Sequence, residues 1–358
     1  MINYVEVRNK YSRLPFAVIE PAECWFELAY YGCGEFEVYA KASKNALAAL
    51  QNGNYISLPR KPYLWVIEDV NATYEAGRGY MVSAKGRQAK AILEKRIINK
   101  RTQLPKDLST AVLNLIRDHA GEGAGGLRKI EGLEELASVV VQPINETQVS
   151  YTNLLTYTEG LIKSYEVGAE LTITEADTFR YRLYTGADRS DVIIFSQTFD
   201  NLLSSAYKRN TAALRTYALI GGEGEGTARI TQEYDAAPNA YGIDRAEIFV
   251  DAKDISSTYT DANGEQKELD VTTAAGLATY KEWLTERGKT KLAENVQIET
   301  FDGEIDAAVL DYKFGEGFYL GDRVRVQDDF LGVYITPRIL KFTMRQDRAY
   351  SELVEYGG

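Results

Sequence analysis

The sequence has few of the residues on which metal sites and many catalytic sites depend. It contains one histidine, His119, and two cysteines, Cys24 and Cys33, among 358 residues. A site with several histidine ligands is therefore impossible, and a Ser–His–Asp triad could use only His119. We expect both cysteines to be buried, reduced thiols on adjacent strands, since two are too few for a disulfide framework. We expect His119 near the end of a helix, where it is charged or simply exposed.

Long apolar runs and long basic runs are also missing. The longest apolar stretches, such as 192–195, are far shorter than the roughly 20 residues that span a bilayer. Residues 1–8 lack the basic and apolar regions of a signal peptide, so we expect assembly in a cytoplasm and no membrane segment. The main basic groups, such as Lys208 with Arg209, are expected on solvated faces or in subunit contacts.

The charge balance disfavours tight binding to nucleic acid. Lys and Arg number 41 and Asp and Glu number 52, which gives a net charge of −11. A protein of this sign repels duplex DNA, which carries a charge about every ~1.7 Å along its axis. The 25 tyrosines stand out, because tyrosine suits protein interfaces. The composition therefore favours an assembly component over an enzyme.

The order of the patterns predicts a β-rich α+β protein with several domains. Alternating segments in 1–97 predict a first β-barrel domain, with one hairpin over 25–39 and another over 64–84. Helical spacing from residue 87 onward predicts a mainly helical module over 98–168.

A second β-barrel domain is predicted from 169–251 together with 296–358, and a helical insertion from 252–295. It begins with a hairpin over 171–184. The two β units could be an old duplication, but their residue-level similarity is too weak to establish one.

Two patterns could carry chemistry, and both have a structural explanation. The glycine cluster 221–226 lacks the lysine and hydroxyl of a phosphate-binding loop, which predicts a hairpin turn. The pairs Glu35/Glu37 and Glu223/Glu225 would place two carboxylates on one strand face, as glycoside hydrolysis could use. Such pairs arise by chance among 52 acidic residues. We therefore nominate no catalytic, cofactor-binding or metal-binding residue and expect no cofactor.

Several segments, in order and at this spacing, resemble the baseplate hub, or tail-associated, family at the tail tip of siphophages, which is similar to the trimeric hub of contractile tails. Each motif alone is weak, but the ordered set covers nearly the whole chain. The segments are 86–97, 195–202, 217–229, 245–252, 319–326 and 337–340.

The resemblance implies a homotrimer in which each chain supplies two tube-like β-barrels, so that six barrels form a pseudo-sixfold ring. The ring would join the tail tube to the tail tip, at the virion tail tip. Its partners would be the distal tail protein, tail tube proteins and tail-fibre or receptor-binding proteins. DNA would pass through an acidic lumen without specific binding. The chain stops at Gly358, so receptor binding and wall cleavage would belong to other chains.

Two alternatives remain open. One is a carbohydrate- or cell-wall-degrading hydrolase that uses paired carboxylates. The other is a tail tube or capsid-associated structural protein, although a tube protein would be shorter and carry one barrel per chain. An assay of glycan hydrolysis together with the oligomeric state would separate these possibilities from a hub.

Overall fold

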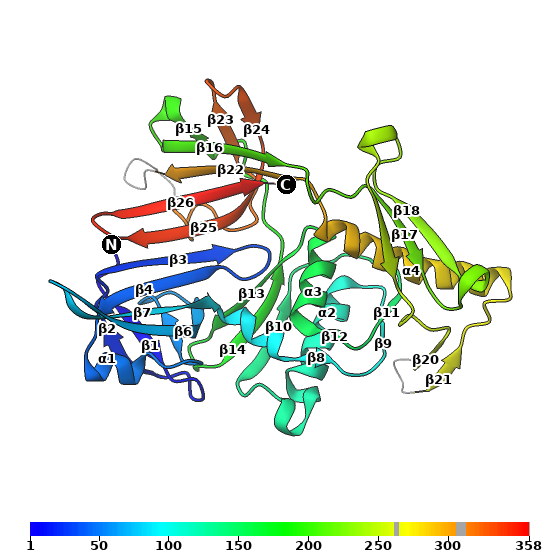
Figure 1. The fold of residues 1–358 in the computed structure, drawn as a ribbon, viewed down its shortest axis with the longest axis horizontal. Coiled ribbons are helices and arrows are strands. Elements are labelled where there is room, and N and C mark those ends of the chain that lie inside the picture. Colours follow the sequence, from blue (N-terminus) through cyan, green and yellow to red (C-terminus); the bar gives the residue numbers. More distant parts are fainter. Residues whose placement is uncertain (261–264, 306–312, 358) are drawn as a thin grey trace.

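The largest element of the fold is one sheet of eleven strands that joins both ends of the chain (Figure 1). The computed structural model describes residues 1–260, 265–305 and 313–357. The strands of this sheet, in spatial order, are β16 (Leu202–Asn210), β22 (Ile298–Ile305), β26 (Tyr350–Gly357), β25 (Arg338–Gln346), β3 (Glu23–Ala29), β4 (Glu35–Lys41), β7 (Gly79–Gln88), β6 (Leu64–Glu75), β5 (Tyr55–Ser57), β1 (Val5–Arg8) and β2 (Pro15–Ile19).

Alternation of apolar and polar residues explains why these segments form strands. In β3, Cys24, Phe26 and Leu28 are buried, whereas Trp25 and Glu27 between them are half-exposed. Successive side chains of a strand point to opposite faces, so one face of the sheet builds a core and the other meets solvent. The predicted hairpins over 25–39 and 64–84 are confirmed by the pairs β3–β4 and β6–β7.

Eight strands of the long sheet form two four-stranded units with the same internal order. Unit 1 is β3-β4-β7-β6, and unit 2 is β16-β22-β26-β25. In both units the spatial order is first, second, fourth and third in sequence, and every pairing is antiparallel. The units meet where β25 pairs with β3. The duplication considered from the sequence stays a prediction, and the shared strand order agrees with it.

The prediction of two closed barrels is not confirmed. Among the described strands, the order of the long sheet runs from β16 to β2 without returning on itself. One apolar core lies under both units and includes Phe26 and Trp65 of unit 1 with Phe342 and Tyr356 of unit 2. The β-rich α+β class is confirmed, but its main sheet is continuous across the two predicted domains.

A mainly helical region holds a second core. Its helices are α2 (Leu108–His119) and α3 (Leu154–Lys163), and their first turns are capped by Asp107 and Asn153. The helix predicted from residue 87 is instead η1 (Ala89–Lys95), a 3₁₀ helix that follows the long strand β7. Short elements complete this region: β8 (Ile97–Ile98), β9 (Thr102–Leu104), η2 (Glu122–Ala124), η3 (Gly126–Arg128), β10 (Leu133–Ser138), β11 (Thr147–Val149), β12 (Thr152–Asn153), β13 (Gly168–Ile173) and β14 (Phe179–Tyr184).

The pair β13–β14 is the hairpin predicted over 171–184. Its inward side chains, among them Phe179 and Tyr181, belong to the second core and not to the core under the long sheet.

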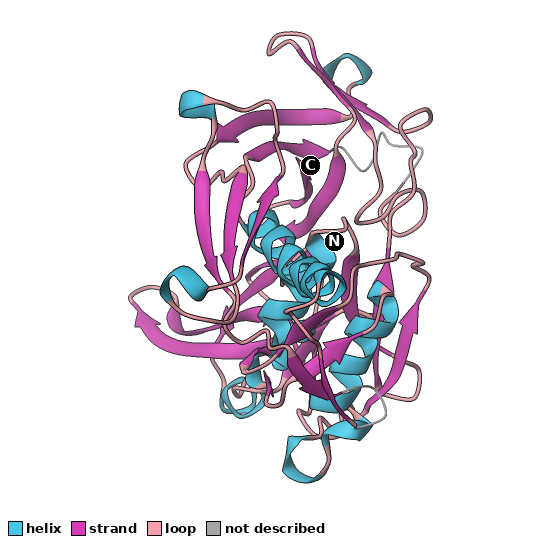
Figure 2. Ribbon diagram, turned by 90° about the vertical axis from the view of Figure 1, so that its right-hand side faces the viewer, coloured by secondary structure: helices cyan, strands magenta, loops and turns pink. Residues whose placement is uncertain are grey.

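A third core lies under α4 (Ala274–Glu294), the long helix predicted within 272–295. Figure 2, viewed from this end, shows helices in the middle of the molecule with strands around them. The turn predicted at 221–226 is confirmed, because β17 and β18 pair antiparallel on either side of it. The elements here are β17 (Tyr217–Gly221), η5 (Gly226–Ala228), β18 (Thr231–Asp235), η6 (Gly242–Asp244), β19 (Glu247–Asp251), β20 (Thr258–Thr260) and β21 (Gln266–Glu268).

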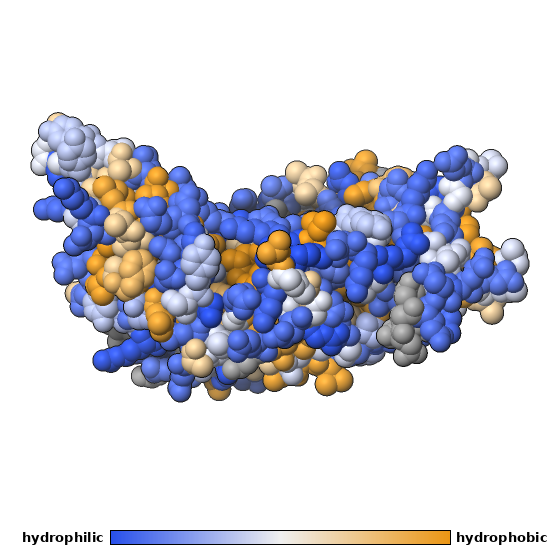
Figure 3. All heavy atoms as spheres, turned by 90° about the horizontal axis from the view of Figure 1, so that it is seen from below, coloured by the Kyte–Doolittle hydropathy of each residue, from blue (hydrophilic) through white to orange (hydrophobic). Residues whose placement is uncertain are grey.

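The remaining elements flank the long sheet. They are α1 (Lys44–Ala49), β15 (Ile194–Ser196), η4 (Gln197–Phe199), β23 (Arg325–Asp328) and β24 (Val333–Ile335). The surface is largely hydrophilic, and apolar side chains gather at the end that carries β1, β2 and α1 (Figure 3). Phe16 and Val18 of β2 are exposed there. The domain boundaries at 97, 168, 251 and 295 remain predictions, and residues 306–312 and 358 of the last range lie outside the described part.

Candidate assembly surface

The face of the long sheet turned away from its core is polar and crosses both units. Strand alternation places both acidic and basic residues on it, with a small excess of acids. The acidic residues include Glu23, Glu27, Glu35, Glu37, Asp69, Asp302, Glu304 and Glu355, and the basic ones include Lys41, Lys85, Arg87, Lys208, Lys341 and Arg345.

A row of charges crosses this face where the two units meet. Lys341 of β25 lies 3.4 Å from a carboxylate oxygen of Glu27 on β3 and 3.4 Å from one of Glu355 on β26. Burial raises the pKa of Glu27 despite the attraction of Lys341. Burial and repulsion from Glu355 also raise the pKa of Asp302. Burial alone would lower the pKa of Lys341, but Glu27 and Glu355 raise it. Lys341 thus forms ion pairs with two carboxylates across the junction and attracts a third, Asp302, through space.

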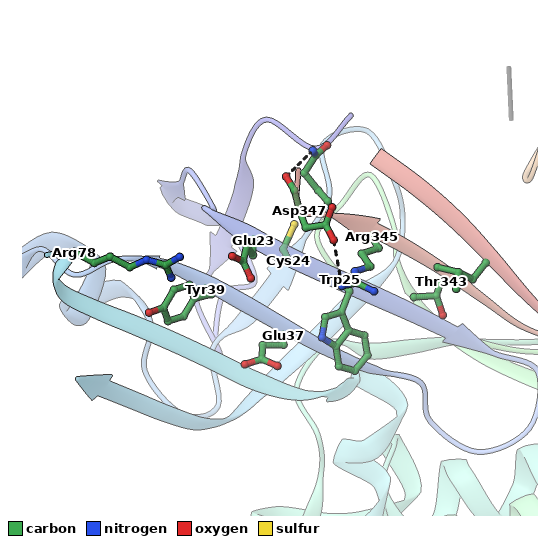
Figure 4. A pocket seen from close by; sticks show the side chains of 11 residues that line it. Glu23, Cys24, Trp25, Glu37, Tyr39, Arg78, Thr343, Arg345 and Asp347 are labelled. Atoms are coloured by element: carbon green, nitrogen blue, oxygen red, sulfur yellow. Dashed lines mark hydrogen bonds and ion pairs between the residues drawn. The ribbon is translucent and has the colours of Figure 1, made fainter. Parts of the chain in front are cut away.

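The same face is hollowed beside this row. A concavity of about 620 Å³ lies over β3, β4 and β25 (Figure 4). Figure 4 shows Arg78 reaching over from the end of the β6–β7 hairpin, while Glu37 and Trp25 lie on the strands. Arg345 forms an ion pair of 3.1 Å with Asp347 at the opposite side. The hollow is broad, open and of mixed charge, which suits a surface passed by solvent or a chain more than a fitted ligand.

The two units match residue by residue, because both contain a β-bulge at the same place. In unit 1 the pairing of β6 with β7 shifts between Ile67 and Asp69. In unit 2 the pairing of β25 with β26 shifts between Ile339 and Lys341. Superposing the bulges makes Asp69 the counterpart of Lys341. The adjoining registers then make Lys85 the counterpart of Glu355, Glu37 of Asp302, Phe26 of Tyr207 and Glu27 of Lys208.

The outer strands of the two units leave two open edges. β5 pairs with residues 64–66 of β6, so the described strands leave the outer edge of residues 69–75 uncovered. β16 pairs with β22, and no described strand lies along its other edge. Figure 1 shows β16 at one end of the long sheet, with β6 and β7 near the other. An open edge presents unpaired backbone groups, which makes it a site for adding another strand.

The positions and burial of the two cysteines and of His119 differ in part from what the sequence predicts. Both cysteines are free; Cys24 is buried in β3, but Cys33 is half-buried in the turn between β3 and β4 instead of on a strand. Burial raises the pKa of Cys24 to about 12 and that of Cys33 to about 11.

His119 does end helix α2, but the expectation of a charged or exposed side chain is wrong. The side chain is fully buried, and burial lowers its pKa to about 4. Neither ring nitrogen has a hydrogen-bond partner among the described residues. A neutral ring is the form that such a site favours.

The paired carboxylates are tied into separate contacts. Glu37 forms an ion pair of 3.1 Å with Lys85, and Glu35 is exposed two residues away on β4. Glu223 accepts a 2.6 Å hydrogen bond from the hydroxyl of Ser256, whereas Glu225 lies 3.8 Å from Lys253. Glu37 lines the concavity over β3, β4 and β25, whereas Glu223 and Glu225 lie between β17 and β18.

Lys90 and Glu286 are among the buried charges that were missed from the sequence. Lys90, which is 2% exposed, donates to the backbone carbonyl of Ala169 at 2.7 Å and pairs with Glu159 at 2.6 Å. Glu286 of α4 is also buried. It accepts hydrogen bonds from Tyr165 and Asn145 and forms an ion pair with Lys289. Both groups are fully paired, which is how a buried charge is tolerated. They attach the helical region to η1 and to α4.

Over the described ranges, no cluster of three or more His, Cys, Asp or Glu side chains is arranged to hold a metal ion. No helix in that part of the chain is long and apolar enough to cross a bilayer.

Comparisons with known proteins agree on the fold. The profile of a family described as Siphovirus ReqiPepy6 Gp37-like protein matches residues 4–355. A search of curated proteins finds no match.

Three solved structures share the fold at 11% sequence identity, and each alignment covers 99% of this chain. One is the 43 kDa tail protein of prophage MuSo2 from Shewanella oneidensis, with a TM-score of 0.58 over 98% of that protein. The second is a tail protein from Neisseria meningitidis MC58, with a TM-score of 0.58 over 96%. The third is the prophage tail protein gp18 from Listeria monocytogenes EGD-e, with a TM-score of 0.50 over 94%.

Proposed function

The chain belongs to the family of Siphovirus ReqiPepy6 Gp37-like proteins, and from this premise we propose that it is the structural baseplate hub of a phage tail. The family resemblance inferred from the sequence is thereby confirmed at the level of a siphovirus tail protein. A structural role in the tail also agrees with the fold that the chain shares with three tail proteins. The position at the tail tip and the hub itself are the proposal.

One observation carries the proposal: two units of identical strand order lie head to tail in one sheet. A head-to-tail contact that repeats with a fixed rotation closes into a ring when the rotation completes a full turn, and gives an open filament when it does not. If three copies continue the pattern, they supply 3 × 2 = 6 units around an axis, which is a pseudo-sixfold ring that fits a hexameric tube. Each unit with its flanking strands would then be one tube-like module, within the ranges 1–97 and 169–251 plus 296–358.

In this ring the polar face of the long sheet lines the hole. The opposite face is excluded from that role because it is buried in the core. The small acidic excess on the polar face would let DNA slide without sticking. The regions 98–168 and 252–295 would lie at the periphery, where contacts with the distal tail protein, tube proteins and fibre or receptor-binding proteins are expected.

The hydrolase alternative has no observation in its favour. A glycosidase needs two carboxyl groups on either side of a bound sugar, about 5 to 10 Å apart. Glu37 is instead neutralised by Lys85 on the neighbouring strand. A single-barrel tube protein is also disfavoured, because this chain carries two strand units.

The oligomeric state tests the proposal. Light scattering should give a mass of 3 × 40.1 = 120.3 kDa for the purified hub. The same preparation should not hydrolyse peptidoglycan or glycans. A stable dimer, or turnover of a glycan that is lost with Glu35→Gln or Glu37→Gln, would contradict the proposal.

The lumen can be tested separately. Glu23→Lys and Glu35→Lys would reverse two exposed charges on the polar face. We expect phages that carry them to eject DNA more slowly, because the lumen would then attract phosphate. Unchanged ejection kinetics would place this face outside the DNA path.

A further inference from the structure

We infer that a pocket between the long sheet and helix α3 binds an acidic segment of another tail protein, in which a carboxylate lies next to an apolar side chain. The pocket has a volume of about 280 Å³, which is enough for one or two side chains and less than most small-molecule sites offer. Thr300 of β22, Lys341 of β25 and Glu355 of β26 line it, so it opens on the polar face of the sheet. This inference goes beyond the proposed hub, because the site is complete within one chain.

The pocket is positively charged although the whole chain is negatively charged. Its cations are Lys163, Arg323, Arg338 and Lys341, and its carboxylates are those of Glu166 and Glu355. The formal charge of the lining is therefore 4 − 2 = +2, against −11 for the chain. An anionic group is attracted to this point of a face that otherwise has an excess of acids.

A carboxylate of the chain itself shows what the two arginines recognise. Oε2 of Glu166 accepts a hydrogen bond of 2.8 Å from Arg338 and one of 3.1 Å from Arg323. Burial alone would raise the pKa of Glu166, but both arginines lower it, so the group is ionised at neutral pH. The side chains of Glu166 and Arg323 are 63% and 44% exposed, so a carboxylate from another chain can reach the same cations.

The backbone at Glu166 is unusual for a residue of this type. Glu166 follows α3 in the left-handed region, with a φ of 55°, where glycine or asparagine is common after a helix. A side chain with a Cβ is strained in this conformation, and such strain is often found at binding sites. The conformation is held where a carboxylate meets two arginines.

Lys163 is the cation with the most remaining capacity for a ligand. It is the last residue of α3 and is half-buried, and its ammonium group has no partner among the described residues. Lys341, by contrast, already forms ion pairs with Glu27 and Glu355. We therefore expect an incoming carboxylate to pair with Lys163 and with the exposed part of Arg323.

The apolar part of the lining favours a peptide over nucleic acid. Val296 is 42% exposed, and Leu340 and Tyr31, which also line the pocket, are half-buried. A phosphodiester has no apolar group to cover these side chains, whereas a peptide can place a carboxylate on the cations and an apolar side chain on the walls. The acids on the rest of the polar face also repel a long polyanion, which a short acidic segment avoids.

Binding of labelled peptides tests the site. The probe is a short fluorescein-labelled peptide of alternating leucine and glutamate with an amidated end, and fluorescence anisotropy measures its affinity. One control peptide replaces glutamate by glutamine, another replaces leucine by serine, and a short labelled DNA duplex is the third control. We expect the leucine–glutamate peptide to bind at least about tenfold more tightly than each control.

Variants of the lining locate the binding. Lys163→Glu should weaken binding of the leucine–glutamate peptide at least about tenfold, because a like charge then meets the carboxylate. Val296→Ser should weaken it about threefold and leave the serine–glutamate peptide unaffected, since only the apolar contact is lost. Circular dichroism shows whether each variant is folded, and Lys163→Arg, which keeps the charge, should bind as the wild type does.

A matched pair of variants separates the pocket from the overall charge. Glu166→Gln removes the carboxylate that competes for the arginines and should strengthen binding at least about threefold. Glu35→Gln changes the net charge equally at an exposed position of the polar face outside the pocket. It should leave the affinity unchanged, and equal strengthening by both variants would contradict a local site.

The other outcomes also decide the proposal. Equal affinity for the leucine and serine peptides would reduce the pocket to a simple anion site and contradict the proposal. DNA binding that depends on Lys163, without peptide binding, would assign the pocket to phosphate groups and overturn it, as would binding of no probe. Light scattering on the same samples reports on the hub separately. A trimer that binds no peptide contradicts only this site, and a monomer that binds the peptide contradicts only the ring.

Discussion

Within the long sheet, β25 pairs with β3 at what we call the joined edge, whereas the described strands leave β16 and residues 69–75 of β6 as open edges. Equivalent strand positions occur at the joined edge and at the open edges, but their surroundings differ. At the joined edge, Phe26 and Leu28 of β3 are fully buried beside the paired strand β25. At the open edge, Tyr207 occupies the position of Phe26 and is 42% exposed. The two side chains have similar apolar area, so equivalent positions differ in how much of that area is removed from water. The comparison teaches that the same strand position can be covered at the β25–β3 junction and exposed at the open edge.

The largest expected difference between the joined edge and the open edge is in the stability lost when the aromatic ring at each position is removed. Phe26→Ala should lower the free energy of unfolding by about 3–5 kcal/mol, because it leaves a cavity in a packed core. Tyr207→Ala should lower it by less than about 1 kcal/mol in the isolated chain, since its ring is partly in solvent. Urea denaturation measures both, and equal losses would mean that β16 already has a neighbour in the single chain.

The second core provides a reference far from both edges. Burial lowers the pKa of His119 to about 4, below its usual value of 6.5. The unfolded chain therefore binds a proton as the pH falls from 6.5 to 4 while the folded chain does not, and stability is lost across this window. The loss can reach about 3 kcal/mol.

His119→Leu should remove this part of the pH dependence and leave stability at neutral pH nearly unchanged. Urea denaturation at several pH values measures it. Because the chain has one histidine, any slope left above pH 5 reports on other groups. An unchanged slope would mean that the imidazole is protonated in the folded protein.

The next largest loss of stability is expected from replacing Lys341, the lysine at the joined edge. Lys341→Met removes the ion-pair partner of Glu27 and Glu355, and we expect a loss of about 1 kcal/mol at neutral pH. The pKa values of Glu27 and Asp302 are already raised. Acids with a raised folded pKa cost stability while ionised, so the variant should recover stability as the pH falls toward those values.

Lys341→Arg is the matched control, since it keeps the charge. It should retain most of the stability and show the pH dependence of the wild type. If the Met variant were as stable as the Arg variant at neutral pH, the ion pairs of Lys341 with Glu27 and Glu355 would contribute nothing to the stability of the joined edge.

The smallest effect on the single chain should come from the open edge. Asp69→Asn should change the free energy of unfolding by less than about 0.5 kcal/mol, because Asp69 is exposed. Its effect should appear in assembly instead, as a lower fraction of oligomer by sedimentation. A large loss of monomer stability would assign Asp69 to the folding of unit 1 alone.

Local patterns were enough to predict much of the fold. The hairpins β3–β4 and β13–β14 and the helix α4 follow from alternation, turn residues and helical spacing. The pairing of β25 with β3 could not be predicted, because more than 300 residues separate the two strands and no local signal encodes such a contact. Two closed barrels were inferred from the number of predicted strands. Because β25 pairs with β3, the two sets of strands instead form one continuous sheet.

The assembly surface was the hardest part to predict. Glu27 and Lys341 look like ordinary solvent-facing residues of two separate strands, and their relation appears when the strands are adjacent. The sequence held one signal of an assembly surface, the basic pair Lys208–Arg209. It was expected on a solvated face or in a subunit contact, but the sequence did not indicate which residues it would meet. His119 was misjudged because a helix end was taken to be exposed, whereas Ile116 in the last turn of α2 and Ala120 directly after it are buried.

The most direct test of the account is an end-on electron microscopy image of the assembled hub. The account predicts a threefold ring of six similar units, with the polar face of the long sheet around the hole. A ring of another order, or one whose hole is lined by the α4 region, would contradict it.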